Sequence, residues 1–342
     1  MKKKKKVQTK KKSSTGKTRI TARIVSAALV LAFVACCAVG NWFVHHPREW
    51  LDAHRAFYTA PLWYFGNRTA FLTDALGWTG HDTVYDFDEA APSNQVFFAG
   101  APERTGAPAP KDITVLRRGE FAIGWSPSLR RPVWCAYHVT PQKPYESGRR
   151  PNFSKDKEAA NSPAPSAYER SGYDRGHMVP NHAIETCYGI EVQKKTFLMS
   201  NVAPQTPALN RGVWRNVEHR IADFWPAKYG ELWVIVGTIP SGRGETLSGT
   251  DIEIPGRFYQ VIVAQEGMDV RALAVVFDQH VSWREWAARN IVSIDELEEE
   301  TGLDFLPDLP KFIQDRLEEG RPSRLWPIRA RDIFGLIRLN LE

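Results

Sequence analysis

The stretch from Tyr173 to Pro180 reads YDRGHMVP, and it is the most informative part of this chain for fold and site. SNVAPQ follows at residues 200–205, and then come Asn210, Trp214 and Glu218. The 44 residues from Arg175 to Glu218 therefore hold an imidazole that titrates near neutrality, an amide oxygen suited to a hard cation, and a guanidinium suited to an anion. Each group is common alone, but together at this spacing they predict an active site.

His177 lies between Gly176 and Pro180, directly after an Asp-Arg pair, so we expect it at a tightly shaped loop edge. A lone histidine is more often a satisfied polar residue than a catalytic one. Its imidazole can nevertheless take a proton from water at neutral pH. Arg175 precedes it by two residues, which on an extended strand points both side chains to the same face. The Arg175 guanidinium can bind an anion, pair with Asp174, or do both.

Asn210, Trp214 and Glu218 recur every four residues. If residues 208–218 are helical, the amide and the carboxylate lie on the same side of the helix. Mid-chain asparagines are usually caps or turn residues. A neutral amide oxygen is nonetheless a sensible single protein ligand for Mg²⁺, because the ion then keeps several waters and its full charge.

Strand-like runs alternate with long connections through the rest of the chain. Ser126–Pro132 makes a turn between two of these runs, as in an antiparallel meander. Apolar spacing predicts a helix over 208–229, and an acidic helix start after Ser293 is stopped by Gly302 and Pro307. The predicted strands are 113–116, 121–125, 133–140, 232–237, 257–263 and 270–277.

The N-terminal 23 residues hold eleven lysines or arginines and no acid, and subtracting them from the net charge of +6 leaves −5 on the remainder. A nucleic acid bound by that remainder would therefore need a local basic cleft.

Residues 24–44 carry no charge over 21 residues, and a helix needs about 20 residues to span a bilayer. The preceding cations predict an anchor with residues beyond 45 outside the cytoplasm. A signal peptide cut after Gly40, which would give a secreted protein, or a lipoprotein cut before Cys36, are the alternatives.

Cys36 and Cys37 lie inside this apolar span, so Cys135 and Cys187 remain for the body of the protein. One disulfide or two buried free thiols are both compatible with the sequence.

The chain resembles the DNA/RNA non-specific endonuclease family, which includes mitochondrial endonuclease G and secreted bacterial nucleases. The resemblance rests on the DRGH motif with Pro180, and on Ser200-Asn201, Pro204-Gln205, Asn210, Trp214 and Glu218. The similarity runs from about Gly119 to Asp308. It implies an α+β fold, in which helices flank a mostly antiparallel central sheet and the active site is a ββα-metal (His-Me) finger.

The same resemblance implies the roles of the site residues. His177 becomes the general base, and Asn210 becomes the ligand of a single Mg²⁺ that Mn²⁺ can replace. Asn201 and Glu218 occupy positions that orient the site and the metal's waters. Arg150 matches a second family arginine, although the adjacent Arg149 makes that register ambiguous. We expect Asp174 to contact and orient the site residues without itself binding the metal or the substrate.

The activity implied is hydrolysis of DNA and RNA to products with 5′-phosphates. Two alternatives are kept open: a phosphodiesterase acting on nucleotides or another ester, and a non-catalytic membrane-tethered nucleic-acid-binding protein.

We expect five segments along the chain: a basic cytoplasmic tail (1–23), the anchor or signal peptide (24–44), an N-terminal extension of helices and loops (45–110), the endonuclease domain (111–320) and a C-terminal extension (321–342).

Overall fold

The computed structural model describes residues 84–86, 94, 96–145, 148–266, 269–332 and 335. The chain divides into two compact units, residues 1–73 and 74–342, and all described residues belong to the second. The expected anchor at residues 24–44 lies outside the described residues, as does most of the expected N-terminal extension. Within the described part, no helix is both long and apolar enough to cross a membrane.

One large sheet forms the centre of this unit, and every pairing within it is antiparallel. Its strand order is β1-β10-β9-β8-β5-β4-β3, with β11 pairing β10. All six strands predicted from the sequence are present, most of them longer than predicted. The strands of this sheet are β1 (Val84–Asp86), β3 (Thr114–Arg117), β4 (Phe121–Ser126), β5 (Arg131–Val139), β8 (Leu232–Pro240), β9 (Pro255–Glu266), β10 (Asp269–Asp278) and β11 (Ile291–Val292).

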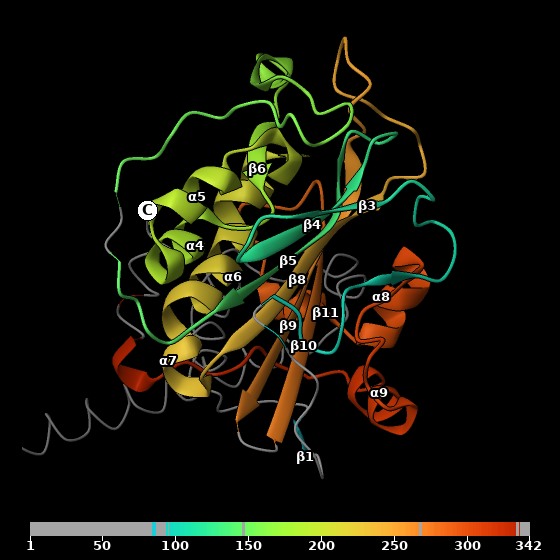
Figure 1. Ribbon diagram of the computed structural model, residues 1–342. Coiled ribbons are helices and arrows are strands. Elements are labelled where there is room, and N and C mark those ends of the chain that lie inside the picture. Colours follow the sequence, from blue (N-terminus) through green and yellow to red (C-terminus); the bar gives the residue numbers. More distant parts are fainter. Residues whose placement is uncertain are drawn as a thin grey trace, which may run out of the picture. The chain divides into compact units, whose positions relative to one another are not determined.

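Helices cover both faces of this sheet, as the expected α+β fold requires (Figure 1). One face carries α4 (Asn181–Tyr188), α5 (Ile190–Thr196), α6 (Arg215–His219) and α7 (Pro226–Tyr229). The other carries α8 (Ile294–Thr301) and α9 (Lys311–Glu318). Because the central strands are covered on both faces, they are continuous apolar runs without polar alternation, and every residue of β5 is buried.

The core between the sheet and α8 and α9 joins segments far apart in the chain. Trp134 and Val261 of the sheet pack in one cluster with Leu297 of α8 and Leu317 of α9. Phe97 belongs to the same cluster, so chain before residue 111 contributes to this core. On the opposite face, the indole nitrogen of Trp225 donates to the carbonyl of Trp326 at 2.7 Å, which ties chain after residue 320 to the sheet's helical layer.

Helix α8 begins and ends where the sequence predicted. The Ser293 hydroxyl accepts from the Glu296 amide, and the Glu296 carboxylate accepts from the Ser293 amide, which is a capping box. Gly302 ends the helix at φ +67°, a left-handed conformation that suits glycine because it has no Cβ.

The helix predicted at 208–229 is also present, but it is not a regular α-helix. Two π-helical turns, η4 (Leu209–Trp214) and η5 (Arg220–Phe224), flank α6, and Gly212 has non-helical dihedrals of −101° and −114°. Its buried side is anchored by Trp214, whose ring packs edge-on against Phe258 and Phe277 of the sheet. π-Helical turns are rare and occur often at functional sites.

The two cysteines of the body are buried free thiols, so the free-thiol alternative holds and the disulfide alternative is wrong. Cys135 is on β5 and Cys187 is on α4. The Sγ of Cys187 accepts a hydrogen bond from Lys143, and Cys135 is completely enclosed.

Candidate active site

The YDRGHMVP stretch forms the edge of a two-stranded ribbon. Strand β6 (Asp174–His177) pairs antiparallel with β7 (Val202–Gln205), so that His177 lies opposite Val202 and Gly176 opposite Ala203. Helices α4 and α5 are inserted between the two strands, and the irregular helix from η4 onward follows β7 directly. The two strands and this helix form the ββα unit that the resemblance implied.

Gly176 is needed because the ribbon is closely packed at this point. A Cβ on residue 176 would overlap the side chain of Gln205, which is completely buried. Glycine here lets the backbone between Arg175 and His177 lie against the second strand.

We therefore expect Gly176→Ala to destabilise the protein by about 1–3 kcal/mol through overpacking, and to lower cleavage because both neighbouring side chains move. Thermal unfolding and a cleavage assay measure the two effects. Gly106→Ala is the matched control, because a Cβ there meets nothing within 4 Å. An unchanged melting temperature for Gly176→Ala would contradict this account of the ribbon.

His177 ends β6 on the wall of a pocket of about 900 Å³. Its ring packs between two aromatic side chains, with centroid distances of 5.0 Å to Phe153 and 4.7 Å to Phe197. Its Nε2 has no hydrogen-bond partner among the described residues. Burial, and secondly the positive charge of Arg150, lower the pKa of His177 to about 4. The imidazole is therefore neutral at pH 7 and can accept a proton.

Asp174 holds the side chain of Asn210 in place. Its carboxylate accepts a hydrogen bond from the Asn210 amide nitrogen at 2.9 Å, and two from Arg211 at 2.8 and 2.5 Å. Burial alone would raise the pKa of Asp174, but the hydrogen bonds from Arg211 and Asn210 hold it below its ordinary value. Since Nδ2 of Asn210 is used in this bond, the amide's oxygen is the atom left for another ligand.

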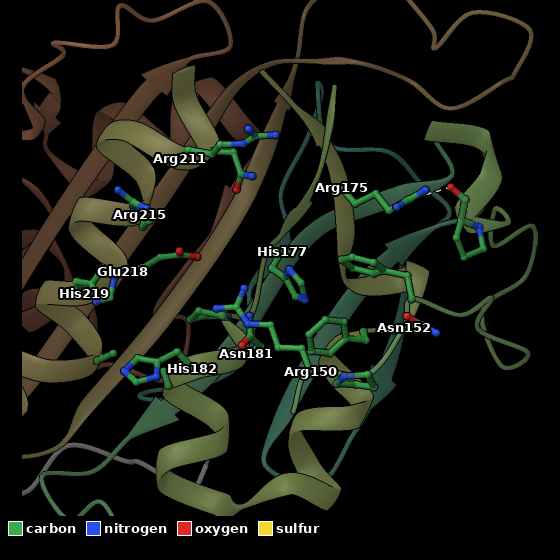
Figure 2. A pocket seen from close by; sticks show the side chains of 18 residues that line it. Arg150, Asn152, Arg175, His177, Asn181, His182, Arg211, Arg215, Glu218 and His219 are labelled. Carbon is green, nitrogen blue, oxygen red and sulfur yellow. Dashed lines mark hydrogen bonds between the residues drawn. The ribbon is translucent and has the colours of Figure 1, made fainter. Parts of the chain in front are cut away.

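Glu218 lies about two turns beyond Asn210 along the same irregular helix and also lines the pocket. The indole nitrogen of Trp214 donates to one of its carboxylate oxygens at 2.9 Å. In Figure 2 the carboxylate points across the pocket toward His177. Burial raises the pKa of Glu218 to about 8, against the lowering effects of the Trp214 bond and the Arg215 charge. A cation bound beside this carboxylate would favour its ionised form.

The pocket is basic although the body of the protein is acidic. Four arginines line it, Arg150, Arg175, Arg211 and Arg215, whereas Glu218 is the one carboxylate among its described lining residues. The local basic cleft expected for a nucleic-acid ligand is therefore present. The arginines come from different elements and surround His177 and Glu218 (Figure 2).

Arg175 is not paired with Asp174. Its Nε donates to the Pro165 carbonyl at 3.0 Å, and its guanidinium lies 5.6 Å from the centre of the Phe153 ring. The guanidinium is thereby held at the pocket wall. Arg150 lines the pocket and Arg149 does not, so the structure selects Arg150 from the adjacent pair.

Asn201 does not line the pocket. Its side chain is fully buried and makes three hydrogen bonds to two backbone segments, donating to the carbonyls of Val179 and Thr196 and accepting from the Val179 amide. The backbone after His177 is thus fixed to α5 and η3 (Met199–Asn201). Asn201 positions the histidine segment from behind. Met178, the residue after His177, is fully buried in the core.

Several pocket residues were not singled out from the sequence. Arg211, Arg215 and His219 recur every four residues, one position after the series Asn210, Trp214 and Glu218, so helical periodicity could have found them. Asn181 and His182 enter from the start of α4, directly after Pro180.

Comparisons with known proteins agree with this arrangement. The sequence profile of the DNA/RNA non-specific endonuclease family matches residues 99–312. A nuclease from Nostoc sp. is 31% identical over 224 residues, which cover 60% of this chain and 78% of that protein. Mitochondrial endonuclease G from Bos taurus is 24% identical over 245 residues, covering 62% of this chain and 79% of that protein.

A chain in the crystal structure of the EndoG/EndoGI complex has the same fold. It superposes with a TM-score of 0.51 at 22% identity, covering 58% of this chain and 87% of the other.

Proposed function

This chain belongs to the DNA/RNA non-specific endonuclease family and is a nuclease, and we propose that His177 is the general base with which it hydrolyses phosphodiester bonds to 5′-phosphate products. The observation that carries the proposal is the place of the His177 imidazole, which lines a basic pocket opposite Glu218. Its Nε2 is buried and has no hydrogen-bond partner among the described residues. Plasmid cleavage by wild-type protein and by a His177 variant tests it.

In the proposed reaction His177 takes a proton from a water molecule as the water oxygen bonds to phosphorus. The bond between phosphorus and the 3′ oxygen breaks, and that oxygen takes a proton from a second water molecule. His177 then returns its proton to the hydroxide that remains. The products are a 5′-phosphate and a 3′-hydroxyl. A base that is neutral at working pH is required for the first proton transfer. The lowered pKa keeps the His177 ring unprotonated at pH 7, and it also makes the ring a weaker base than an unshifted imidazole.

The family is one of metal-dependent nucleases, and for the metal we propose Mg²⁺, with Mn²⁺ as a substitute. Asn210 would hold it through its amide oxygen, because its nitrogen donates to Asp174. Glu218 would stand beside it as the carboxylate whose ionised form a cation favours. Bound there, Mg²⁺ would neutralise charge on the phosphate oxygens.

The arginines supply the remaining recognition of the phosphate. Arg175 and Arg150 both line the pocket with His177 and would hold non-bridging oxygens there, since a guanidinium can bind them through two parallel hydrogen bonds. Arg211 and Arg215 extend the basic surface along the helix, where neighbouring phosphates of the strand would lie.

We expect both DNA and RNA, single- or double-stranded, to be cut with little sequence preference. The pocket presents groups that bind phosphate, and phosphate contacts carry no sequence information. Binding should weaken steeply as salt rises. Cleavage rates on labelled DNA and RNA of several sequences measure this. Cutting confined to one short sequence, or to RNA alone, would contradict the proposal.

We further propose that residues 24–44 anchor the protein in a membrane with the nuclease outside the cytoplasm. The uncharged 21-residue span and the eleven preceding cations support this placement. Protease added to intact cells should cleave beyond residue 47, and deletion of residues 1–46 should leave a soluble, active nuclease. Full-length protein that stays protected inside the cytoplasm would rule the placement out.

A further inference from the structure

Three metal-ligating side chains meet at the edge of the pocket, outside the groups used above. They are His182 at the start of α4, His219 at the end of α6, and Asp223 in η5. Their ligand atoms all lie within 4.8 Å of one another. His182 and His219 both line the pocket, below Glu218 in Figure 2, so the cluster opens toward the place where substrate would bind.

Asp223 brings the two imidazoles together. One carboxylate oxygen is 2.9 Å from Nε2 of His182, and the other is 2.9 Å from Nδ1 of His219. The ring centroids are 6.0 Å apart. One nitrogen of each ring therefore faces the same carboxylate, and the side chains are between 25% and 37% exposed, so an ion can reach them.

These donors are the kind that a transition metal uses. Two imidazole nitrogens with one carboxylate are a familiar donor set for zinc, with metal–ligand distances of about 2.0–2.2 Å. At such distances tetrahedral ligand atoms lie about 3.4 Å apart. The two separations of 2.9 Å would need to open by about 0.5 Å, and the remaining separations, all within 4.8 Å, would need to reach about the same value.

We propose that His182, His219 and Asp223 form a second metal site, which binds Zn²⁺ or a similar transition metal and is distinct from the oxygen site at Asn210. Imidazole ligands favour zinc over magnesium, whereas amide and water oxygens favour magnesium, so the two sites select different ions. Three protein ligands leave the fourth position of the zinc open, and here it would open on the pocket. The proposal does not depend on the nuclease reaction, because metal binding alone tests it.

The experiment is a Co²⁺ and Zn²⁺ titration of the full-length, metal-stripped protein in the presence of excess Mg²⁺. Visible absorption of Co²⁺ reports its coordination, and calorimetry reports the Zn²⁺ stoichiometry. We expect one equivalent of either ion to bind. Asp223→Asn and His182→Gln should each weaken binding about tenfold or more. Both variants retain hydrogen-bonding side chains, and circular dichroism of each variant is the check that it is folded.

Two control variants separate this site from other histidines. His280→Ala removes an exposed histidine outside the cluster, and His177→Ala removes the proposed base, so both should bind Zn²⁺ as the wild type does. The proposal is overturned if no ion binds under these conditions, in which case the three residues form only a hydrogen-bonded bridge between helices. It is equally overturned if Zn²⁺ binding survives in folded Asp223→Asn and His182→Gln, or is lost in His177→Ala.

Discussion

Alanine in place of His177 should lower kcat/KM for DNA cleavage by about 10²- to 10⁴-fold, because that is the usual contribution of a general base. The ring packs against Phe153 and Phe197, and its Nε2 makes no hydrogen bond to the described residues. Its removal therefore leaves no described partner of Nε2 unsatisfied, and the variant should stay folded. Initial rates on plasmid DNA, with circular dichroism of the same samples, give the result.

His280→Ala is the matched control for this loss, since His280 is exposed and does not line the pocket.

The pH dependence of kcat/KM is a second measurement of the role of His177. The pKa of His177 lies below its ordinary value, so the base stays neutral as pH falls through 6.5 and is lost only as pH approaches about 4. Replacing Arg150 with glutamine removes a charge that lowers this pKa, so the acid limb of kcat/KM should move to higher pH. A His177→Ala protein that keeps more than about a tenth of the activity would exclude the assignment.

The second large effect is expected at Asn210. Its alanine variant should need at least about tenfold more Mg²⁺ for half-maximal activity, because the proposed amide ligand is gone. Asp174→Asn should act in the same direction but less strongly, since Asp174 orients the amide through the 2.9 Å hydrogen bond. Cleavage rates measured across a series of Mg²⁺ concentrations give both values.

Asn152→Ala is the control for Asn210, because Asn152 lines the same pocket on the side away from Glu218 (Figure 2). It should leave the Mg²⁺ requirement near the wild-type value. If Asn210→Ala has the Mg²⁺ requirement of the wild type, the metal is held elsewhere.

Much of the fold could be predicted because it rests on local signals. Strands such as β8 are continuous apolar runs, and α8 has both its capping box and its terminal glycine in the sequence. Helix α4 was not predicted, because residues 181–188 have weak apolar periodicity and no capping side chain at the start. The π-helical turns at 209–214 and 220–224 were also not predicted, since they depend on how Trp214 packs against the sheet.

The candidate site was predictable where its residues are adjacent in sequence or on one helix. His177, Arg175, Asn210 and Glu218 were identified in this way, and all four line one pocket. Residues that come together only in the folded chain were not predicted from the sequence. Asp174 forms an ion pair with Arg211 and not with its sequence neighbour Arg175.

His182, His219 and Asp223 lie close together although they belong to different helices. Asn201 was expected in the site, but its side chain is fully buried outside the pocket and binds the backbone of Val179 and Thr196.

The central claim is that this pocket is a metal-dependent nuclease site, and plasmid cleavage by the purified full-length protein, with Mg²⁺ and in chelator, tests it most directly. The account predicts degradation with Mg²⁺ or Mn²⁺, none in excess chelator, and recovery when Mg²⁺ is restored. Degradation that continues in chelator, or an intact plasmid with both metals, would contradict it.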